Sequence, residues 1–507
     1  MEFKSILYAD SGQTAQKGVP SFFQDLQLDY LLEIIEGTVK GYDIKPYYYT
    51  LPATSALISY RQQICKDLYE GSLCEVIRQF CQSIQKSVVA YELSEESDGE
   101  VQAATYHLQS ANIYIQALNK IKKHLDEAEL SSEGLIMLRE YVEKHIHHME
   151  SSGFIEAVNR ANEFFTQIRF QLVISEERIT ISEAECSTEN FFEELVNLLG
   201  LDEDDVDTSL HDIYPGALEP SLLEATLVNM LRKSRPEIFK EIAGFHKKYQ
   251  KFHSDILLRF DKEVQFYIGF MAFIKKAEAS GYRFCMPDIS SDGEFEGTGV
   301  YDVALVFKNA HQNYQVVSND FSWTKKPAFF VVTGPNQGGK TTFARSLGQS
   351  VYFSMMGLYA NGASLTMPYF DGIATHFEAE EVLQSNSGKL KEEINRLKPM
   401  MKQEKTRQFI ILNELFTTAT THDALIMGRK VMEHFLKKQC YGIYVTHIQE
   451  LADENDSIIS LVAQAEDGEE RRRTYRIMPM KAQGYGYSDS LVKQFELRYE
   501  DIVRRLS

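Results

Sequence analysis

Residues 333–342 read Thr-Gly-Pro-Asn-Gln-Gly-Gly-Lys-Thr-Thr and match the phosphate-loop pattern G-x-x-x-x-G-K-[ST] at every position. The apolar run 328–332 just before them predicts a buried strand. After them, apolar side chains recur at helical spacing, at positions 343, 347, 351 and 355. A glycine loop between a strand and a helix is the context in which this pattern binds phosphate. The segment therefore predicts a nucleoside triphosphate site.

Individual residues of this loop have predicted roles. Lys340 is expected to reach the β- and γ-phosphates, and the Thr341 hydroxyl is expected to ligate Mg²⁺. The predicted ATP-binding residues are Gly334, Pro335, Asn336, Gln337, Gly338, Gly339, Lys340, Thr341 and Thr342.

A second buried-strand pattern, 407–414, ends on the polar pair Asn413 and Glu414. Glu414 is expected to orient the water that attacks the γ-phosphate; the alternative is an exposed carboxylate at a strand end. Asn413 stands where an acidic Mg²⁺ ligand is usual, so we expect it in the metal site with Thr341. Because an amide carries no charge, the affinity for Mg²⁺ should be lower.

A third strand pattern, 441–446, is followed by His447. A histidine at this strand end can sense or polarise a γ-phosphate, so His447 is a second catalytic candidate. The alternative is a histidine with a structural role only.

Together these motifs resemble those of the MutS family of ABC-type ATPases. The loop 333–342 is similar to the family's T-G-P-N-M-G-G-K-S-T. Residues 410–423 resemble L-V-L-x-D-E-x-x-x-G-T-S-T-x-D, with Glu414, Thr421 and Asp423 in register. Residues 446–451 resemble T-H-Y-x-E-L, and 484–492 look like the family's closing segment. The resemblance is strong over 285–507 and weaker over 1–285.

The resemblance implies a multidomain chain: a mostly α-helical lever and clamp region, followed by an α/β P-loop NTPase domain of ABC type. The expected parts are a helical core region (1–100), a helical lever and clamp with a short β-hairpin (101–285) and the ATPase domain (286–507). In the family two ATPase domains pack face to face with nucleotide between them, so a homodimer is expected.

The family's signature loop, S-x-F-x-x-E, has a candidate match at 385–393. Ser387 is the expected serine, which in the family reaches the nucleotide of the partner subunit, and Glu393 matches the acid. A polar helix start capped by Ser387 is the alternative.

Helical patterns fill much of the amino-terminal half: they begin at 21–29, break at the Tyr- and Pro-rich stretch 42–52 and resume over 55–93. An acidic loop is expected at 94–100, a helix over 108–125 and a β-hairpin over 168–181. Residues 1–100 contain no Phe-x-Glu wedge, and few residues precede the lever-like region. The resemblance therefore implies a member without the mismatch-recognition and connector domains.

The net charge of −20 opposes DNA binding over most of the chain. Residues 231–262 differ, with nine Lys or Arg against four Asp or Glu, interleaved with aromatic residues. This pattern predicts a long amphipathic helix with a buried aromatic face and a solvated basic face, which is also a candidate DNA surface. The candidate DNA-binding residues are Arg232, Lys233, Arg235, Lys247, Lys248 and Lys251.

Six scattered cysteines fit no zinc or disulfide pattern, and no apolar run is long enough to span a bilayer. With no leader pattern at the start, these features favour a cytoplasmic protein without a membrane partner. The expected function is a MutS-like ATPase that uses ATP and Mg²⁺ to close a clamp on double-stranded or branched DNA, without recognising mismatches. The alternatives are an ABC-type ATPase acting on protein or RNA, and a nucleotide-binding scaffold with little hydrolysis.

Overall fold

The computed structural model describes residues 3–9, 12–97, 99–166, 170–175, 178–183, 230, 232–233, 235–310, 314–323, 327–377, 388–453, 455–465 and 473–482. The chain divides into two compact units. The helical unit comprises residues 1–3, 72–130 and 135–261, and the α/β unit comprises 4–71, 131–134 and 262–507. The predicted order, a helical region followed by an α/β region, is confirmed. The predicted domain boundaries at residues 100 and 285 stay a prediction.

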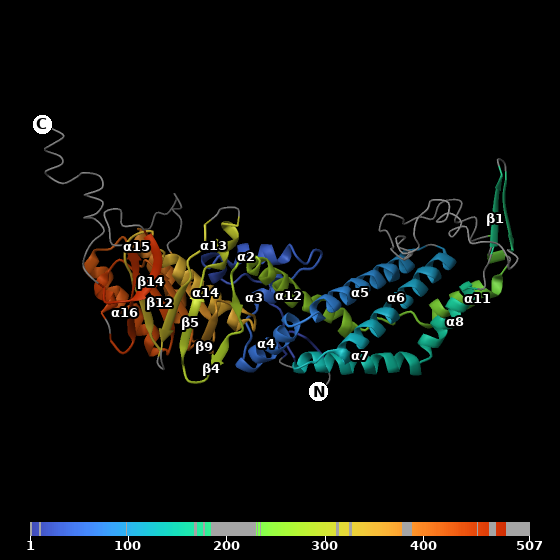
Figure 1. Cartoon of the computed structure of the whole chain (residues 1–507), viewed down its shortest axis with the longest axis horizontal. Helices are drawn as coiled ribbons and strands as arrows, with labels where there is room; N and C mark the ends of the chain where they lie inside the picture. The colour runs from blue at the N-terminus through green and yellow to red at the C-terminus, as the bar shows by residue number, and fades with distance from the viewer. Residues whose placement is uncertain are drawn as a thin grey trace. The chain divides into compact units, whose positions relative to one another are not determined.

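The centre of the α/β unit is a six-stranded sheet with the order β10-β11-β12-β7-β13-β14. Two of its strands, β12 and β14, are labelled in Figure 1. Its strands are β10 (Ile373–His376), β11 (Phe409–Asn413), β12 (Tyr441–Val445), β7 (Phe329–Thr333), β13 (Ile458–Ala465) and β14 (Arg473–Pro479). All neighbours are parallel except β14, which is antiparallel to β13. Every residue of β7, β11 and β12 is buried, as the unbroken apolar runs predict for strands covered on both faces.

Helices cover both faces of this sheet. On one face, α15 (Lys389–Lys402) and α16 (Thr421–Lys437) share an apolar core with Ile410 and Leu412 of β11. On the other face lies α14 (Lys340–Met355), where a Cβ on Gly348 would meet Ile411 at 2.6 Å and Leu26 at 2.5 Å. This glycine allows close packing of α14 against the sheet. The short helix η1 (Gln449–Ala452) follows β12.

Amino-terminal helices belong to the same unit: α1 (Phe22–Asp25), α2 (Leu28–Glu36), α3 (Lys45–Tyr49) and α4 (Ser55–Tyr69). Two side chains of α14 donate hydrogen bonds to backbone carbonyl groups of this amino-terminal segment. Gln349 Nε2 donates to the Leu26 carbonyl (3.1 Å), and the Tyr352 hydroxyl donates to the Tyr48 carbonyl (2.7 Å). The start of the chain thus supports the helix that begins in the glycine loop.

A smaller four-stranded sheet, order β4-β9-β5-β6, and the pair β3-β8 complete the α/β unit. The strands are β3 (Phe284–Cys285), β4 (Asp288–Ser290), β5 (Phe295–Val300), β6 (Asn319–Trp323), β8 (Ala360–Asn361) and β9 (Ser364–Pro368). Between β5 and β6 lies the helix α13 (Val303–Lys308).

The long helices α5 (Leu73–Glu96) and α6 (Glu100–Glu127) of the helical unit lie side by side (Figure 1). α8 (Phe154–Thr166) and α11 (Pro236–Lys248) contact α6. α7 (Glu133–Ser151) and α12 (Asp255–Glu278) each contribute residues to both units. The predicted hairpin is confirmed as β1 (Phe170–Ser175) and β2 (Arg178–Glu183).

The single long helix predicted over 231–262 is wrong. α11 ends at Lys248, and α12 begins at Asp255. Side chains from distant parts of the sequence contact backbone carbonyl groups in the turn between these two helices. His107 Nε2 lies 2.9 Å from the Tyr249 carbonyl oxygen, and the Tyr91 hydroxyl donates to the Gln250 carbonyl oxygen (2.6 Å). These tertiary contacts compensate for the hydrogen bonds that a continuous helix would make.

Two smaller predictions also need correction. The stretch 42–52 contains the short helix α3, because a proline fits the first turn of a helix and the buried Tyr48 hydroxyl donates to the Phe266 carbonyl (2.8 Å). The acidic loop is shorter than predicted, since α5 continues to Glu96. There the Ser94 and Ser97 hydroxyls donate to carbonyls of the preceding turn.

No helix in the described ranges is long and apolar enough to cross a membrane. The cysteines in those ranges are free thiols, at positions 65, 74, 81, 285 and 440.

Candidate functional site

The glycine loop joins β7 to α14 at the carboxyl edge of the parallel strands. Gly334 has φ of 124°, and a Cβ there would lie 2.9 Å from Ala463. Gly339, the residue before α14, has φ of 91°. A side chain at either position would be strained, so the glycines are needed for the loop to pass this closely over the sheet.

Lys340, the first residue of α14, is held inside the loop. Its side chain is nearly buried, and Nζ donates to the carbonyl oxygens of Gly334 (2.9 Å) and Pro335 (3.0 Å). Burial lowers the pKa of Lys340, while the charge of Glu414 acts in the opposite direction. The ammonium group therefore lies where the phosphate-loop pattern requires a cation.

Thr341 and Asn413 meet at the same edge of the sheet. The Thr341 hydroxyl donates to Asn413 Oδ1 at 2.9 Å, and Asn413 is 8% exposed at the end of β11. Asn413 thus presents an uncharged oxygen toward the start of α14. In the described part of the chain, no group of three or more His, Cys, Asp or Glu residues is arranged to hold a metal ion.

Glu414 and His447 form a second polar pair beside Lys340. His447 Nε2 lies 3.0 Å from Glu414 Oε1, and the two side chains are 44% and 26% exposed. The hydrogen bond from His447 holds the pKa of Glu414 below its usual value, against the opposing effect of burial. The carboxylate is therefore ionised near neutral pH and can accept a proton or a hydrogen bond from water.

One cavity of about 740 Å³ joins the glycine loop, Glu414 and His447 to the surface. Apart from the loop, the cavity is lined by aromatic, aliphatic and asparagine side chains. They are Tyr301, Leu305, Asn309, Tyr314, Val316, Asn319 and Tyr475. Sequence reasoning missed these residues because they belong to no motif and come from three separate stretches of chain.

Asn319 fixes one side of this cavity. Its Nδ2 donates to the Tyr475 oxygen (3.2 Å), and its Oδ1 accepts from the Ile477 amide (2.7 Å). Tyr475 has φ of 58°, which is rare for an aromatic residue. The two hydrogen bonds hold β14, and with it Tyr475, next to the glycine loop.

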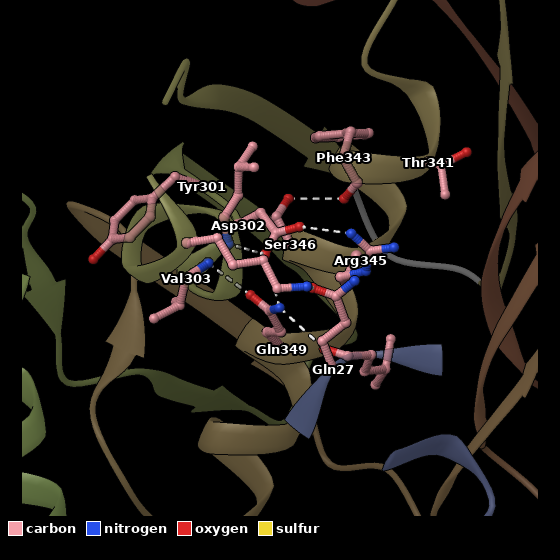
Figure 2. Close-up of polar contacts among 12 residues, drawn as sticks. Gln27, Tyr301, Asp302, Val303, Thr341, Phe343, Arg345, Ser346 and Gln349 are labelled. Atoms are coloured by element: carbon pink, nitrogen blue, oxygen red, sulfur yellow. Dashed lines mark hydrogen bonds and ion pairs between the residues drawn. The ribbon is translucent and has the colours of Figure 1, made fainter. Parts of the chain in front are cut away.

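A buried polar network supports the helix that starts in the loop (Figure 2). Asp302 is 1% exposed and caps α13 by accepting from the Leu305 amide. It also accepts from Arg345 Nη1 (3.2 Å) and Gln349 Nε2 (2.9 Å), whose side chains point toward it in Figure 2. Since Asp302 caps α13 and the other two residues belong to α14, the network fixes the cavity wall relative to the loop.

The predicted serine of the signature loop, Ser387, lies outside the described residues. Glu393, which matches the acid of that motif, lies on α15. Its Oε1 accepts a 2.6 Å hydrogen bond from the Phe416 amide, two residues after Glu414. A carboxylate predicted only from a resemblance thus contacts the loop that follows β11.

The candidate DNA-binding residues belong to the helical unit. All six are exposed, whereas Phe239 and Phe245 of α11 are buried, as predicted for an amphipathic segment. Two of the cations are near one carboxylate: Glu100 lies 3.1 Å from Lys247 and 3.8 Å from Arg232. Lys248 Nζ lies 4.8 Å from the ring centroid of Tyr249.

Comparisons with known proteins agree with the motifs. The family model described as MutS domain V matches residues 330–486. "DNA mismatch repair protein MutS" of Thermotoga petrophila is 26% identical over 241 residues, 46% of this chain and 29% of the relative. The protein of that name from Shouchella clausii is 27% identical over 246 residues, 48% of this chain and 27% of the relative.

A eukaryotic relative, "DNA mismatch repair protein msh-3" of Neurospora crassa, is 27% identical over 165 residues, 32% of this chain and 14% of that protein. The match to this chain thus covers less than a third of each of these relatives. The segment that the family model matches, 330–486, contains the glycine loop, Glu414 and His447. Over that segment, the chain is similar to the MutS family.

Proposed function

We propose that the α/β unit is an ABC-type P-loop ATPase and that the chain is a MutS-like, DNA-binding clamp protein. One observation carries the first part. Lys340 and Thr341 at the start of α14 and Glu414 just after β11 line a single cavity, and Asn413 at the end of β11 accepts a hydrogen bond from Thr341.

The residues of the loop suit a triphosphate. The ammonium group of Lys340, which rests on two loop carbonyls, would hold phosphate oxygens, as would the amides at the start of α14. Thr341 and Asn413 would hold Mg²⁺ through their side-chain oxygens. The ion, when bound, neutralises negative charge on the phosphates. The aromatic and apolar wall of the cavity suits the base of ATP.

Glu414 is the proposed water-positioning residue. Its ionised carboxylate accepts hydrogen bonds, and His447 keeps one of its oxygens in place. His447 would also sense or polarise the γ-phosphate. In the dimer expected from the family, Ser387 would complete the nucleotide site of the partner subunit.

For the helical unit we propose a DNA-facing role without mismatch recognition. The exposed cations of 232–251 support contact with the phosphates of double-stranded or branched DNA. ATP binding would pair two α/β units and change the grip of the helical units on DNA. The named relatives are DNA mismatch repair proteins, and this supports DNA as the partner.

Two observations favour the alternatives. The uncharged Asn413 favours a nucleotide-binding scaffold with little hydrolysis. The pairing of Lys247 and Arg232 with Glu100 favours a protein or RNA partner, since it reduces the positive charge presented to DNA.

Equilibrium binding of a fluorescent ATP analogue and phosphate release test the proposal, with Lys340→Ala as the key variant. Wild type should bind and hydrolyse ATP, and Lys340→Ala should lose binding because it removes the cation that faces the phosphates. Equal binding by the two proteins would refute the nucleotide site.

Gel shifts with duplex DNA, with ATP or ADP present, separate DNA from other partners.

A further inference from the structure

The loop that follows β11 contains two residues in an unusual backbone conformation. Glu414 has φ of 53° and Phe416 has φ of 63°. For residues other than glycine, such conformations are strained and persist only where surrounding contacts impose them. The contacts that hold the backbone of these two residues therefore help to determine the direction of the Glu414 carboxylate.

The backbone amide of each of these residues donates a hydrogen bond. The Glu414 amide donates to the Val445 carbonyl of β12 at 2.9 Å, which extends the ladder between β11 and β12 by one residue. The Phe416 amide donates to Glu393 Oε1 at 2.6 Å. The first contact is part of the sheet, but the second depends on one side chain.

Glu393 reaches the loop from α15, 23 positions earlier in the chain. Hydrogen bonds to an ionised acceptor are stronger than those between neutral groups. The same helix packs Leu397 and Met400 into the apolar core that contains the buried side chains of Leu415 and Phe416. Apolar packing thus brings α15 to the loop, and Glu393 fixes one backbone group within it.

We propose that Glu393 is a positioning residue for ATP hydrolysis. By holding the Phe416 amide it maintains the left-handed backbone at Glu414, so that the Glu414 carboxylate stays against His447 in the wall of the cavity. This inference rests on the proposed ATPase function and adds a residue that acts through the Phe416 amide.

Two variants separate the hydrogen-bond acceptor on the Glu393 side chain from its charge. Glu393→Gln keeps a carbonyl oxygen that can accept from Phe416, whereas Glu393→Ala removes the acceptor. Glu393→Asp, one methylene shorter, withdraws the oxygen and replaces Glu393→Ala if that variant does not fold. Glu404→Ala, at an exposed carboxylate just beyond α15, is the matched control.

Steady-state phosphate release and equilibrium binding of a fluorescent ATP analogue are measured on the full chain. In Glu393→Ala, kcat should fall at least tenfold while the Kd for nucleotide changes less than twofold. Glu393→Gln should recover most of the turnover, and Glu404→Ala should match wild type. Unchanged kcat in Glu393→Ala, or a parallel loss of kcat, nucleotide affinity and melting temperature, would overturn the inference.

Hydrogen exchange of the Phe416 amide tests the contact without nucleotide. Exchange should be at least tenfold faster in Glu393→Ala than in Glu404→Ala, and equal exchange would overturn the inference even if the chain hydrolyses ATP. A wild-type chain without turnover would instead refute the proposed ATPase, and the hydrolytic role of Glu393 with it.

Discussion

The Thr341 hydroxyl donates a 2.9 Å hydrogen bond to Asn413 Oδ1, so the first turn of α14 is joined to the end of β11 by two uncharged side chains. Mg²⁺ is a hard cation that prefers charged oxygen ligands. This site therefore offers a bound Mg²⁺ less electrostatic attraction than one with a carboxylate at position 413.

Asn413→Asp should lower the Mg²⁺ concentration that gives half-maximal ATPase activity. The substitution adds a charge and keeps an oxygen that can accept from Thr341. A magnesium titration of phosphate release measures the effect, with Asn395→Asp, at an exposed amide on α15, as the control. If both variants show the wild-type requirement, Asn413 does not act on the metal.

Glu414→Gln should retain ATP binding and reduce turnover by about a hundredfold or more, which corresponds to at least about 2.7 kcal/mol in the barrier. The amide preserves the shape of the side chain but does not accept a proton from water. Binding and single-turnover hydrolysis are compared with those of Glu404→Gln. Turnover near that of wild type would remove Glu414 from the water-positioning role.

His447→Ala should move the acidic limb of the pH–rate profile to higher pH. The His447 hydrogen bond lowers the pKa of Glu414, so its removal raises that pKa and protonates the carboxylate at a higher pH. The profile of kcat/KM must extend below pH 4.5, the ordinary pKa of a glutamate carboxyl, because the lowered pKa of Glu414 places the wild-type limb there. His422→Ala, at an exposed histidine at the start of α16, should leave the limb in place. A limb that does not move in His447→Ala would mean that another group controls it.

The stability of the helical unit should fall as the pH decreases from about 6.5 to about 4. Burial lowers the pKa of His107 and of His253 to about 4, from the ordinary value of 6.5. The unfolded chain therefore binds more protons in this window, and the folded state loses on the order of 3 kcal/mol for His107 alone.

Chemical denaturation of the full chain at several pH values measures this loss in the free energy of unfolding of the helical unit. His107→Gln should flatten the dependence on pH, because the amide does not titrate but can still donate to the Tyr249 carbonyl. The exposed His147 provides the control His147→Gln. A pH slope as steep in His107→Gln as in His147→Gln would contradict the assignment.

The central sheet could be predicted because its strands are unbroken apolar runs with recognisable motifs at their ends. The break between α11 and α12 could not, since it depends on Tyr91 and His107, far away in the sequence. The contact between Glu393 and Phe416 could not be predicted either, because the two residues lie 23 positions apart in the sequence. Local patterns define strands and loops, but only the fold determines which distant side chain meets a given backbone group.

Replacing Lys247, Lys248 and Lys251 with Ala should weaken DNA binding and flatten its salt dependence together. Removing one lysine that neutralises a phosphate should reduce the slope of log K against log salt concentration by about 0.9 for duplex DNA. A control with the same change in charge replaces Lys120, Lys123 and Lys144, which are exposed elsewhere in the helical unit.

Glu100→Gln should have the opposite effect, because it frees Lys247 and Arg232 from a competing carboxylate. Affinity for a matched duplex should rise, and the salt slope should steepen. A duplex with one mismatch should bind no better than a matched one in any variant, since residues 1–100 contain no Phe-x-Glu wedge. If the salt slope of DNA binding does not change in either variant, the DNA site lies elsewhere or a protein partner is favoured. A clear preference for mismatched duplexes would contradict the proposed role of the helical unit.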